Sequence, residues 1–248
     1  MTRPVFVLEP DRFAGVGASV VLRGPEGRHA AVVRRIGPGE CIDLVDGTGR
    51  RAVGVVEEVD GAELTLRLET VEHEPEPSPR LVLVQALAKG DRDDQAIEAA
   101  TELGVDAIVP WQAARSIVRW RGPRGEKAHR KWVDQVYAAA KQSRRARFPV
   151  VEPLVDTAGL ARRIASADAA FILHEEAHTP LAGAPLPASG DVLVIIGPEG
   201  GITPEELAVL RSAGGAAVRL GRTVLRSSSA GPAALAVLSA VERWRHGG

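Results

Sequence analysis

The most informative stretch of the chain is VLVIIGPEGGITPEE, which runs over Val192–Glu206. Its first five residues are apolar and four of them are β-branched, which predicts a strand buried on both faces. A glycine-rich turn at Gly197–Gly201 follows directly. It leads into a helix expected over residues 204–212, with Thr203 at the N-cap and Pro204 at the first helical position. In open α/β sheets such turns bind ligands at the carboxyl ends of strands, although an ordinary strand-to-helix connection has the same pattern.

The chain around this stretch alternates between apolar strands and helices. Apolar runs predict strands at residues 81–87, 105–109, 169–173 and 217–220, of which the second is expected to end at Pro110. Helices are expected at residues 91–103, 127–142 and 230–245, with Gly104 as the C-cap of the first and one of Ser227–Ser229 as a candidate cap of the last. This alternation predicts a parallel sheet covered by helices on both faces, so residues 80–248 are expected to be an α/β domain.

The first 72 residues follow a different pattern. Short strands with alternating apolar residues are expected at 50–56 and 63–68, turns at 46–49 and 60–61, and one helix near 25–35. These elements predict a small β-barrel over residues 1–72. The acidic, proline-rich segment Glu72–Pro79 cannot hold regular structure, and it is the expected domain boundary.

Composition excludes several classes of protein. The 248 residues are 45% hydrophobic and 25% charged, which is ordinary for a globular protein. No run approaches the roughly 18 apolar residues of a membrane span, and the N-terminal residues lack the apolar segment of a signal peptide, so we expect a cytoplasmic protein. The single cysteine, Cys41, lies in an alternating stretch and is expected to be a small core residue. The six histidines are scattered, and no metal site is expected.

The charge distribution points to a polyanionic partner despite a net charge of −1. Residues 111–147 carry eleven Lys or Arg against two acidic residues, whereas residues 57–76 carry eight acidic residues against one Arg. A basic segment of this size is typical of proteins that bind nucleic acid. A solvated helix and loop is the alternative.

Two turns carry the chemistry that the sequence suggests. The first, Gly197–Gly201, has no Gly-x-x-x-x-Gly-Lys motif, and its Glu199 would repel a phosphate. It suits a cationic or hydroxyl-bearing ligand, and S-adenosylmethionine, with its sulfonium and ammonium groups, is one. The second turn lies in LGRTVLRSSSA, Leu220–Ala230, and again connects a strand to a helix. Arg226 within it is not explained by packing.

These two turns resemble the knotted SPOUT superfamily of methyltransferases, and more narrowly the bacterial 16S ribosomal RNA uracil-N3 methyltransferases. The resemblance rests on Gly-Pro-Glu-Gly-Gly at 197–201 and on Leu-Gly-x-x-x-Leu-Arg at 220–226. It covers nearly the whole chain, because further matching blocks lie at Lys89–Arg92, Ala100–Pro110, Arg115-Ser116, Gln142–Arg145 with Pro149, and His29 with Arg35 and Gly39. The chain departs from the family at Ser227–Ser229, where Thr-Glu-Thr is common, at Arg144, where a small residue is usual, and at Ala99, where Lys is common.

The resemblance implies a fold, a reaction and a set of site residues. It implies a trefoil knot in the α/β domain, a PUA-like β-barrel before it, a homodimer, and transfer of a methyl group from S-adenosyl-L-methionine to N3 of a uridine in 16S ribosomal RNA or the small ribosomal subunit. The expected cofactor-binding residues are Leu173, Ile196, Gly197, Glu199, Gly200, Gly201, Leu220, Gly221, Leu225, Arg226, Ser227 and Ser228. The expected catalytic residues are Arg226 and, second, Arg145. The expected RNA-binding residues are Arg3, His29, Arg35, Lys89, Arg92, Arg115, Gln142 and Arg145.

Two other functions are compatible with these motifs. A ribose 2′-O-methyltransferase of the same superfamily could act on ribosomal or transfer RNA, although the N-terminal module with His29 and Arg35 speaks against it. A non-catalytic RNA-binding assembly factor would use the glycine-rich turns only as structural connections.

Overall fold

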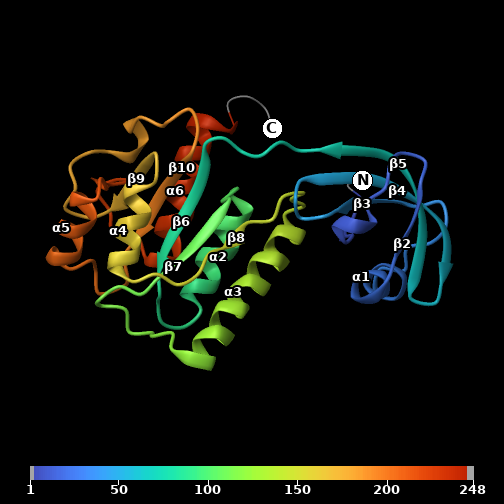
Figure 1. Cartoon of the computed structure of the whole chain (residues 1–248), viewed down its shortest axis with the longest axis horizontal. Coiled ribbons are helices and arrows are strands. Elements are labelled where there is room, and N and C mark those ends of the chain that lie inside the picture. Colours follow the sequence, from blue (N-terminus) through green and yellow to red (C-terminus); the bar gives the residue numbers. More distant parts are fainter. Residues whose placement is uncertain (1–2, 245–248) are drawn as a thin grey trace. The chain divides into compact units, whose positions relative to one another are not determined.

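The protein divides into two compact units in the computed structural model, which describes residues 3–244 (Figure 1). The first unit comprises the chain up to Glu76 together with Ala140–Phe148, and the second comprises Pro77–Ala139 together with the chain from Pro149 onward. Residues 140–148 were expected in the second domain. They join the first unit because the Gly49 amide donates to the Ala146 carbonyl at 3.0 Å and the Phe148 amide donates to the Gly47 carbonyl at 2.9 Å.

The first unit is built on a sheet with the strand order β1-β3-β4-β5-β2 within the described residues. The strands are β1 Val5–Val7, β2 Ser19–Leu22, β3 Cys41–Val45, β4 Arg50–Asp60 and β5 Glu63–His73. Strands β1 and β3 are parallel, and the other neighbours are antiparallel. The single helix expected near residues 25–35 is the short helix α1, Gly24–Arg28, followed by a π-helical turn, His29–Val33.

Cys41 corrects one expectation from the sequence. It is exposed rather than part of the core. Successive residues of a strand point to opposite faces of the sheet. Since Ile42 and Leu44 are fully buried, Cys41 falls on the outer face with Asp43.

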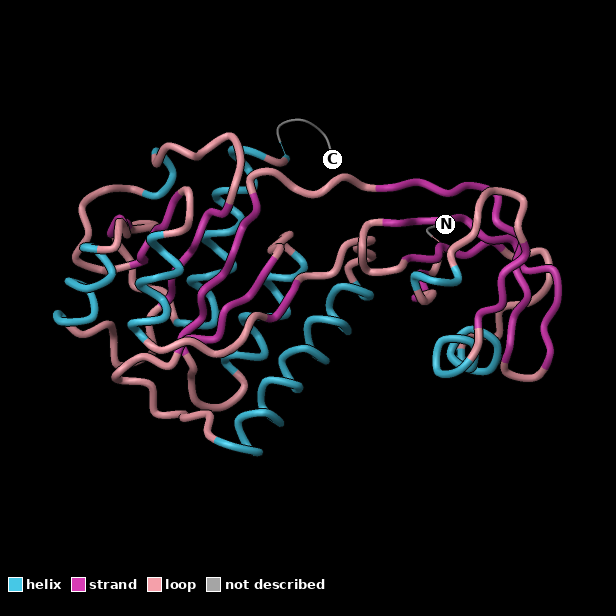
Figure 2. Tube along the Cα trace, viewed as in Figure 1, coloured by secondary structure: helices cyan, strands magenta, loops and turns pink. Residues whose placement is uncertain are grey.

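The second unit contains the predicted parallel sheet. Its strand order is β11-β9-β10-β6-β7-β8, and every neighbouring pair is parallel within the described residues. Figure 2 draws the strands in magenta and the helices in cyan. The strands are β6 Arg80–Ala86, β7 Ala107–Trp111, β8 Val150–Val151, β9 Ala169–Leu173, β10 Asp191–Ile196 and β11 Ala216–Val218. The fold class predicted for this part of the chain is therefore correct.

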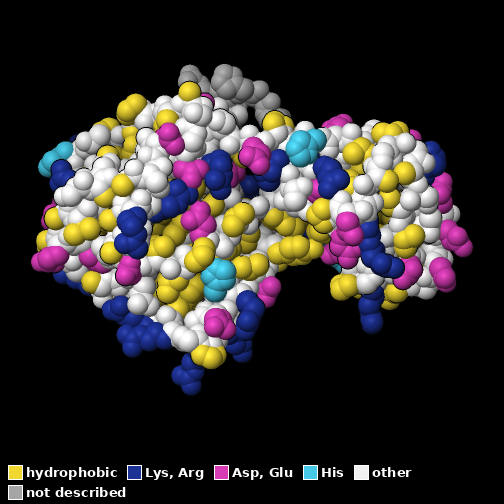
Figure 3. Space-filling model, in the orientation of Figure 1, with side chains coloured by type: hydrophobic (Ala, Val, Ile, Leu, Met, Phe, Trp, Pro, Cys, Tyr) yellow, Lys and Arg dark blue, Asp and Glu magenta, His cyan; other side chains and the backbone are white. Residues whose placement is uncertain are grey.

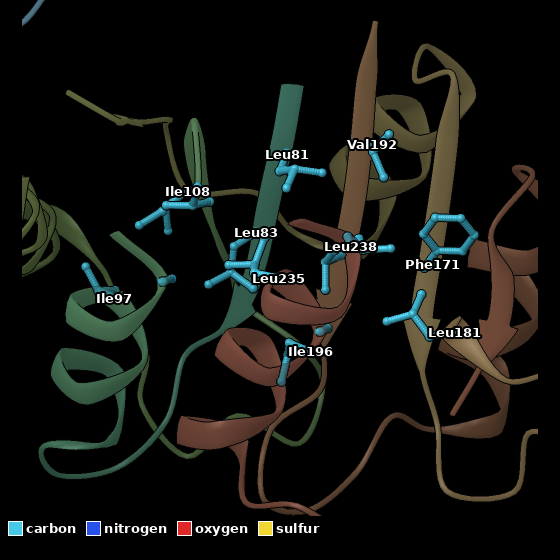
Figure 4. Packing of buried hydrophobic residues seen from close by; sticks show 14 of the residues in the cluster. Leu81, Leu83, Ile97, Ile108, Phe171, Leu181, Val192, Ile196, Leu235 and Leu238 are labelled. Carbon is cyan, nitrogen blue, oxygen red and sulfur yellow. The ribbon is translucent and has the colours of Figure 1, made fainter. Parts of the chain in front are cut away.

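Helices cover both faces of this sheet. Helices α2 Arg92–Glu102, α3 Gly122–Gln142 and α6 Ser227–Glu242 contribute to one buried cluster, and α4 Thr157–Ala165 and α5 Pro204–Ser212 contribute to the other. In the first cluster Leu83 and Ile196 of the strands lie against Leu235 of α6 (Figure 4). Burial on both faces explains the uninterrupted apolar runs of the central strands.

Several element ends differ from the prediction. Pro110 does not end β7 but lies inside it. The ladder with β8 covers only Ala107 and Ile108, and the Pro110 carbonyl, which needs no N–H, accepts a hydrogen bond from the Val155 amide at 2.9 Å. Helix α6 begins at Ser227 with Arg226 as its N-cap, so no serine caps it, and its predicted end at Arg245 lies outside the described residues. Helix α2 ends at Glu102 with Leu103 as its C-cap, so Gly104, which was expected at the cap, lies one residue further on, where its φ of 91° is typical of the glycine that follows a helix end.

Candidate active site

A cavity opens at the carboxyl ends of β9, β10 and β11. These three strands are neighbours in the parallel sheet, so the loops that follow them meet at one edge. The cavity has a volume of about 680 Å³, and its wall is formed mainly by residues 173–175, 196–202 and 219–227. Small-molecule sites usually have volumes of roughly 300–1,000 Å³. The cavity is therefore large enough for a cofactor.

The two turns that were singled out in the sequence form most of this wall. The cavity is lined by these expected cofactor-binding residues: Leu173, Ile196, Gly197, Glu199, Gly200, Gly201, Leu220, Gly221, Leu225, Arg226 and Ser227. Ser228 lines instead a second cavity of about 500 Å³, together with Lys89, Gly90, Asp91, Arg92, Gln95 and Arg226. Arg92 and Arg226 line both cavities.

Other residues of the wall were not named individually as cofactor-binding residues. They belong to the same three loops and are His174, Glu175, Pro198, Ile202, Arg219, Arg222, Thr223, Val224 and Ala230. Arg92 and Arg115 come from other loops and were expected to contact RNA. Nothing local in the sequence connects them with the glycine-rich turn.

Ser227 offers the cavity a hydroxyl that lacks a protein partner. The residue is 9% exposed, and among the described residues its Oγ has no hydrogen-bond partner. Buried polar groups in proteins are nearly always hydrogen-bonded to protein, water or a ligand. Ser227 is also the first residue of α6, where free backbone N–H groups and the helix dipole favour a polar or negative ligand group. This end of the cavity is thus suited to binding a polar group.

Glu199 ties the glycine-rich turn to the loop that precedes α2. Its Oε1 accepts hydrogen bonds from the Lys89 amide at 3.1 Å and from Arg92 Nη1 at 2.5 Å. Burial alone would raise the pKa of Glu199, but these bonds and one from its own backbone outweigh it and lower the pKa. Glu199 is therefore an ionised residue with protein partners, and it orients Lys89 and Arg92 at the second cavity.

A second carboxylate supports the same loop. Asp93, in the first turn of α2, is 7% exposed and accepts a hydrogen bond from the Ala88 amide at 3.0 Å. Burial, with smaller contributions from the nearby Glu199 and Asp94, raises its pKa to about 7 against the lowering effects of that bond and of Lys131. Two carboxylates thus hold the loop of residues 88–91: Asp93 accepts a hydrogen bond from the Ala88 amide, and Glu199 accepts one from the Lys89 amide.

The two candidate catalytic arginines belong to different units. Arg226 is exposed at the start of α6 and has no acidic partner within salt-bridge distance in the part of the chain that the structure describes. Its guanidinium is therefore available to a ligand in either cavity. Arg145 belongs to the first unit, where its Nε donates to the Arg147 carbonyl at 3.1 Å. Its catalytic role stays a prediction.

The expected RNA-binding residues also divide between the units. Lys89, Arg92 and Arg115 lie beside the cavities of the second unit, whereas Arg3, His29, Arg35, Gln142 and Arg145 belong to the first unit. In that unit Arg3 Nε donates to Asp43 at 2.5 Å, and the His29 ring lies edge-on to Phe6 with centroids 5.5 Å apart. Arg35 has a φ of 56°, which is uncommon for a residue other than glycine.

The basic segment 111–147 does not form one patch within either unit. Its residues up to 139 belong to the second unit, and Lys141, Arg144, Arg145 and Arg147 belong to the first. Several of its charges are paired: Lys131 with Asp94 at 2.6 Å and Lys141 with Glu26 at 2.5 Å. On the face that Figure 3 shows, basic and acidic side chains are interspersed.

Comparison with known proteins identifies the class. A family model described as an RNA methyltransferase domain matches residues 74–239, and one described as an RNA methyltransferase PUA domain matches residues 22–69. Together with the parallel sheet and the cavity at its carboxyl edge, these matches define an RNA methyltransferase domain preceded by a PUA domain.

The chain belongs to the ribosomal RNA small subunit methyltransferase E family. It is 44% identical over 239 residues to the protein of that name from Mycobacterium bovis, with 94% of this chain and 91% of the relative covered. It is 29% identical to the Bacillus subtilis protein of that name, with 88% of each chain covered. A crystal structure of the Neisseria gonorrhoeae protein of that name, bound to S-adenosyl methionine, superposes with a TM-score of 0.84 at 28% identity and covers 97% of this chain and 98% of its own.

These findings confirm the predicted family and the fold class with its N-terminal PUA domain. Among the described residues, no helix is both long and apolar enough to cross a membrane. The same part of the chain contains no group of three or more potential metal ligands.

Proposed function

We propose that the chain transfers a methyl group from S-adenosylmethionine to N3 of a uridine in 16S ribosomal RNA. As a member of its family it is an S-adenosylmethionine-dependent ribosomal RNA methyltransferase. The base and the atom are our proposal. The observation that carries it is the cavity between the two glycine-containing turns, where Arg226 and the hydroxyl of Ser227 are both available to ligands.

The cavity fits the cofactor in size and chemistry. S-adenosylmethionine combines an adenosine, which backbone groups can bind, with a polar methionine end. Backbone groups of Leu173, Ile196 and Leu220 would hold the adenosine, and Ser227 would satisfy its buried hydroxyl on a polar group of the ligand. The bound cofactor supplies an electrophilic methyl group.

Arg226 is the residue best suited to activate the acceptor. N3 of uracil carries a proton, and the nitrogen is a poor nucleophile until that proton is lost. A positive charge beside the ring carbonyl oxygens lowers the pKa of this N–H and stabilises the anion that forms. Because Arg226 lines both cavities, its guanidinium can approach an acceptor base that enters beside the cofactor. The base must leave its stack or pair to do so.

Several further properties are part of the same proposal. Lys89 and Arg92 would hold RNA phosphates near the second cavity, with Arg3, Arg35 and Arg145 doing so in the first unit, which makes RNA affinity fall as salt rises. The family resemblance adds the trefoil knot, the homodimer, a site of action in the cytoplasm, and 16S RNA, free or in the small subunit, as substrate.

The test is to map the methylated nucleoside. Incubation with S-adenosylmethionine and 16S RNA or small subunits lacking the modification, followed by digestion and mass spectrometry, is expected to give N3-methyluridine. A 2′-O-methylated nucleoside would support the ribose methyltransferase instead. If no methyl group is transferred and calorimetry detects no heat of S-adenosylmethionine binding, the result would support a non-catalytic assembly factor.

A further inference from the structure

Glu206 is a buried carboxylate outside the cavity that makes more contacts than a helix cap requires. It is 7% exposed and lies in the first turn of α5, where it forms a capping box with Thr203. In that box the Glu206 amide donates to Thr203 Oγ1 at 3.2 Å, and the Thr203 amide donates to Glu206 Oε2 at 3.3 Å. The box uses one carboxylate oxygen. The other oxygen, Oε1, is engaged elsewhere.

Oε1 of Glu206 holds a distant loop. It accepts hydrogen bonds from the Ala114 amide at 2.8 Å and from Thr157 Oγ1 at 2.7 Å. Ala114 lies in the loop of residues 112–121 that follows β7. Arg119 Nη2 also donates to the Ala114 carbonyl, at 2.9 Å. Both backbone groups of Ala114 are thus fixed, and the direction of the next side chain, Arg115, is fixed with them.

Arg115 connects this loop to the wall of the cofactor cavity. Its Nη1 donates to the Gly200 carbonyl at 2.8 Å. The two loops are in close contact, because a Cβ added to Gly200 would lie 3.1 Å from Arg115 Cβ. The turn itself is closed by the Gly201 amide, which donates to the Pro198 carbonyl at 2.8 Å. Arg115 therefore sets the orientation of the peptide between Gly200 and Gly201 at the cavity wall.

We propose that Glu206 is a positioning residue for the cofactor: it holds Ala114 so that Arg115 fixes the Gly200 peptide in the orientation that binds S-adenosylmethionine. The proposal rests on the proposed function, because it assigns the cavity to that cofactor. The Glu206 side chain then has two roles: its Oε2 caps α5, and its Oε1 orders the cavity wall.

The test measures the dissociation constant of S-adenosylmethionine by calorimetry on the full chain, with thermal unfolding of each variant. Glu206→Ala removes both tasks, and we expect affinity to fall about tenfold, the effect of losing one or two strong hydrogen bonds. Arg115→Ala is expected to weaken binding to a similar extent, and the double variant no further than Arg115→Ala alone. Such non-additivity is the signature of residues that act through one another.

Two matched variants distinguish this role from a merely structural one. Glu206→Gln keeps an acceptor for Ala114 and loses the one for Thr203, and Thr203→Val removes the helix cap from the other side. Both should lower the unfolding temperature while the dissociation constant stays within about threefold of the unmodified protein. If Glu206→Ala does not fold, Glu206→Asp, which withdraws the carboxylate from Ala114, replaces it with the same expected loss of affinity.

The proposal is overturned if Glu206→Ala or Glu206→Asp binds S-adenosylmethionine as tightly as the unmodified protein. It is also overturned if Thr203→Val and Glu206→Gln lose as much affinity as Glu206→Ala, or if the effects of Glu206→Ala and Arg115→Ala add. Absence of binding heat in the unmodified protein is a different result, which removes the proposed function itself.

Discussion

The two turns that enclose the cofactor cavity differ in how the protein holds them. The ordered turn, Gly197–Gly201, is fixed by Arg92 on Glu199 at 2.5 Å and by Arg115 on the Gly200 carbonyl at 2.8 Å. The open turn, Gly221–Arg226, is exposed throughout, with Val224 79% exposed and no side-chain cap on the helix that follows. One side of the cavity is therefore preformed, whereas the other leaves its polar groups for ligands to complete.

The largest expected effect comes from the open turn. Arg226→Ala should lower the rate of methyl transfer by about 10²–10³-fold, since removing one preorganised charge that stabilises a developing anion costs roughly 3–4 kcal/mol. The affinity for S-adenosylmethionine should change little. Single-turnover transfer at saturating cofactor measures the first quantity and calorimetry the second.

Arg222→Ala is the matched control for that variant. Arg222 lies in the same turn and lines only the cofactor cavity. Its removal should leave the rate at saturating cofactor unchanged. Equal losses of rate in the two variants would contradict a specific role for Arg226.

Asp93, which supports the loop of residues 88–91 beside the ordered turn, makes the stability of the fold depend on pH. Asp93 has a folded-state pKa of about 7, whereas an unfolded Asp has a pKa of about 3.9. The unfolded chain thus loses this proton from about pH 4 upward while the folded chain keeps it to about pH 7, so stability falls over this window. Asp93→Asn keeps an acceptor for the Ala88 amide. At pH 8 its free energy of unfolding should exceed that of the unmodified protein by roughly a few kcal/mol.

Denaturation at pH 4 and at pH 8 checks this expectation. The advantage of Asp93→Asn should shrink to near zero at pH 4, where the carboxyl group is protonated in the folded chain and about half protonated in the unfolded chain. An advantage of the same size at both values would show that the substitution acts through packing alone.

Replacing one glycine in each turn by alanine compares how tightly the two turns are packed. A Cβ at Gly197 would lie 2.7 Å from Cγ1 of the buried Ile202, whereas a Cβ at Gly221 would meet no atom within 4 Å. Gly197→Ala should therefore destabilise the fold by about 1–3 kcal/mol. Gly221→Ala should be neutral or slightly stabilising, because it restricts only the unfolded chain. Thermal unfolding of both variants is the measurement, and equal destabilisation would contradict the difference between the turns.

The smallest expected effect is that of Ser227→Ala. Deleting the unpartnered hydroxyl should leave stability without cofactor nearly unchanged, because no protein hydrogen bond is lost. It should weaken S-adenosylmethionine binding several-fold, by roughly 1 kcal/mol for one neutral hydrogen bond. Unfolding temperatures with and without cofactor report both quantities. A loss of stability without cofactor would point to a protein partner for this hydroxyl.

The difference between the turns also explains what the sequence could predict. Strand, turn and helix are local patterns, so the buried strand before Gly197 and the capping box at Thr203 were predictable, and the alternation around Ile42 could have placed Cys41 outside. The contacts that fix the ordered turn join residues far apart in the chain, as between Arg115 and Gly200 or between Ala114 and Glu206. No local pattern encodes them. The packing of residues 140–148 against the first unit escaped prediction for the same reason.

Hydrogen–deuterium exchange with and without S-adenosylmethionine tests most directly whether both turns enclose the cofactor. We expect the cofactor to slow exchange in peptides that cover residues 196–201 and 219–228, with the larger change in the second, because the open turn has more order to gain. Protection of neither segment, or of only one of them, would contradict a cofactor site between the two turns.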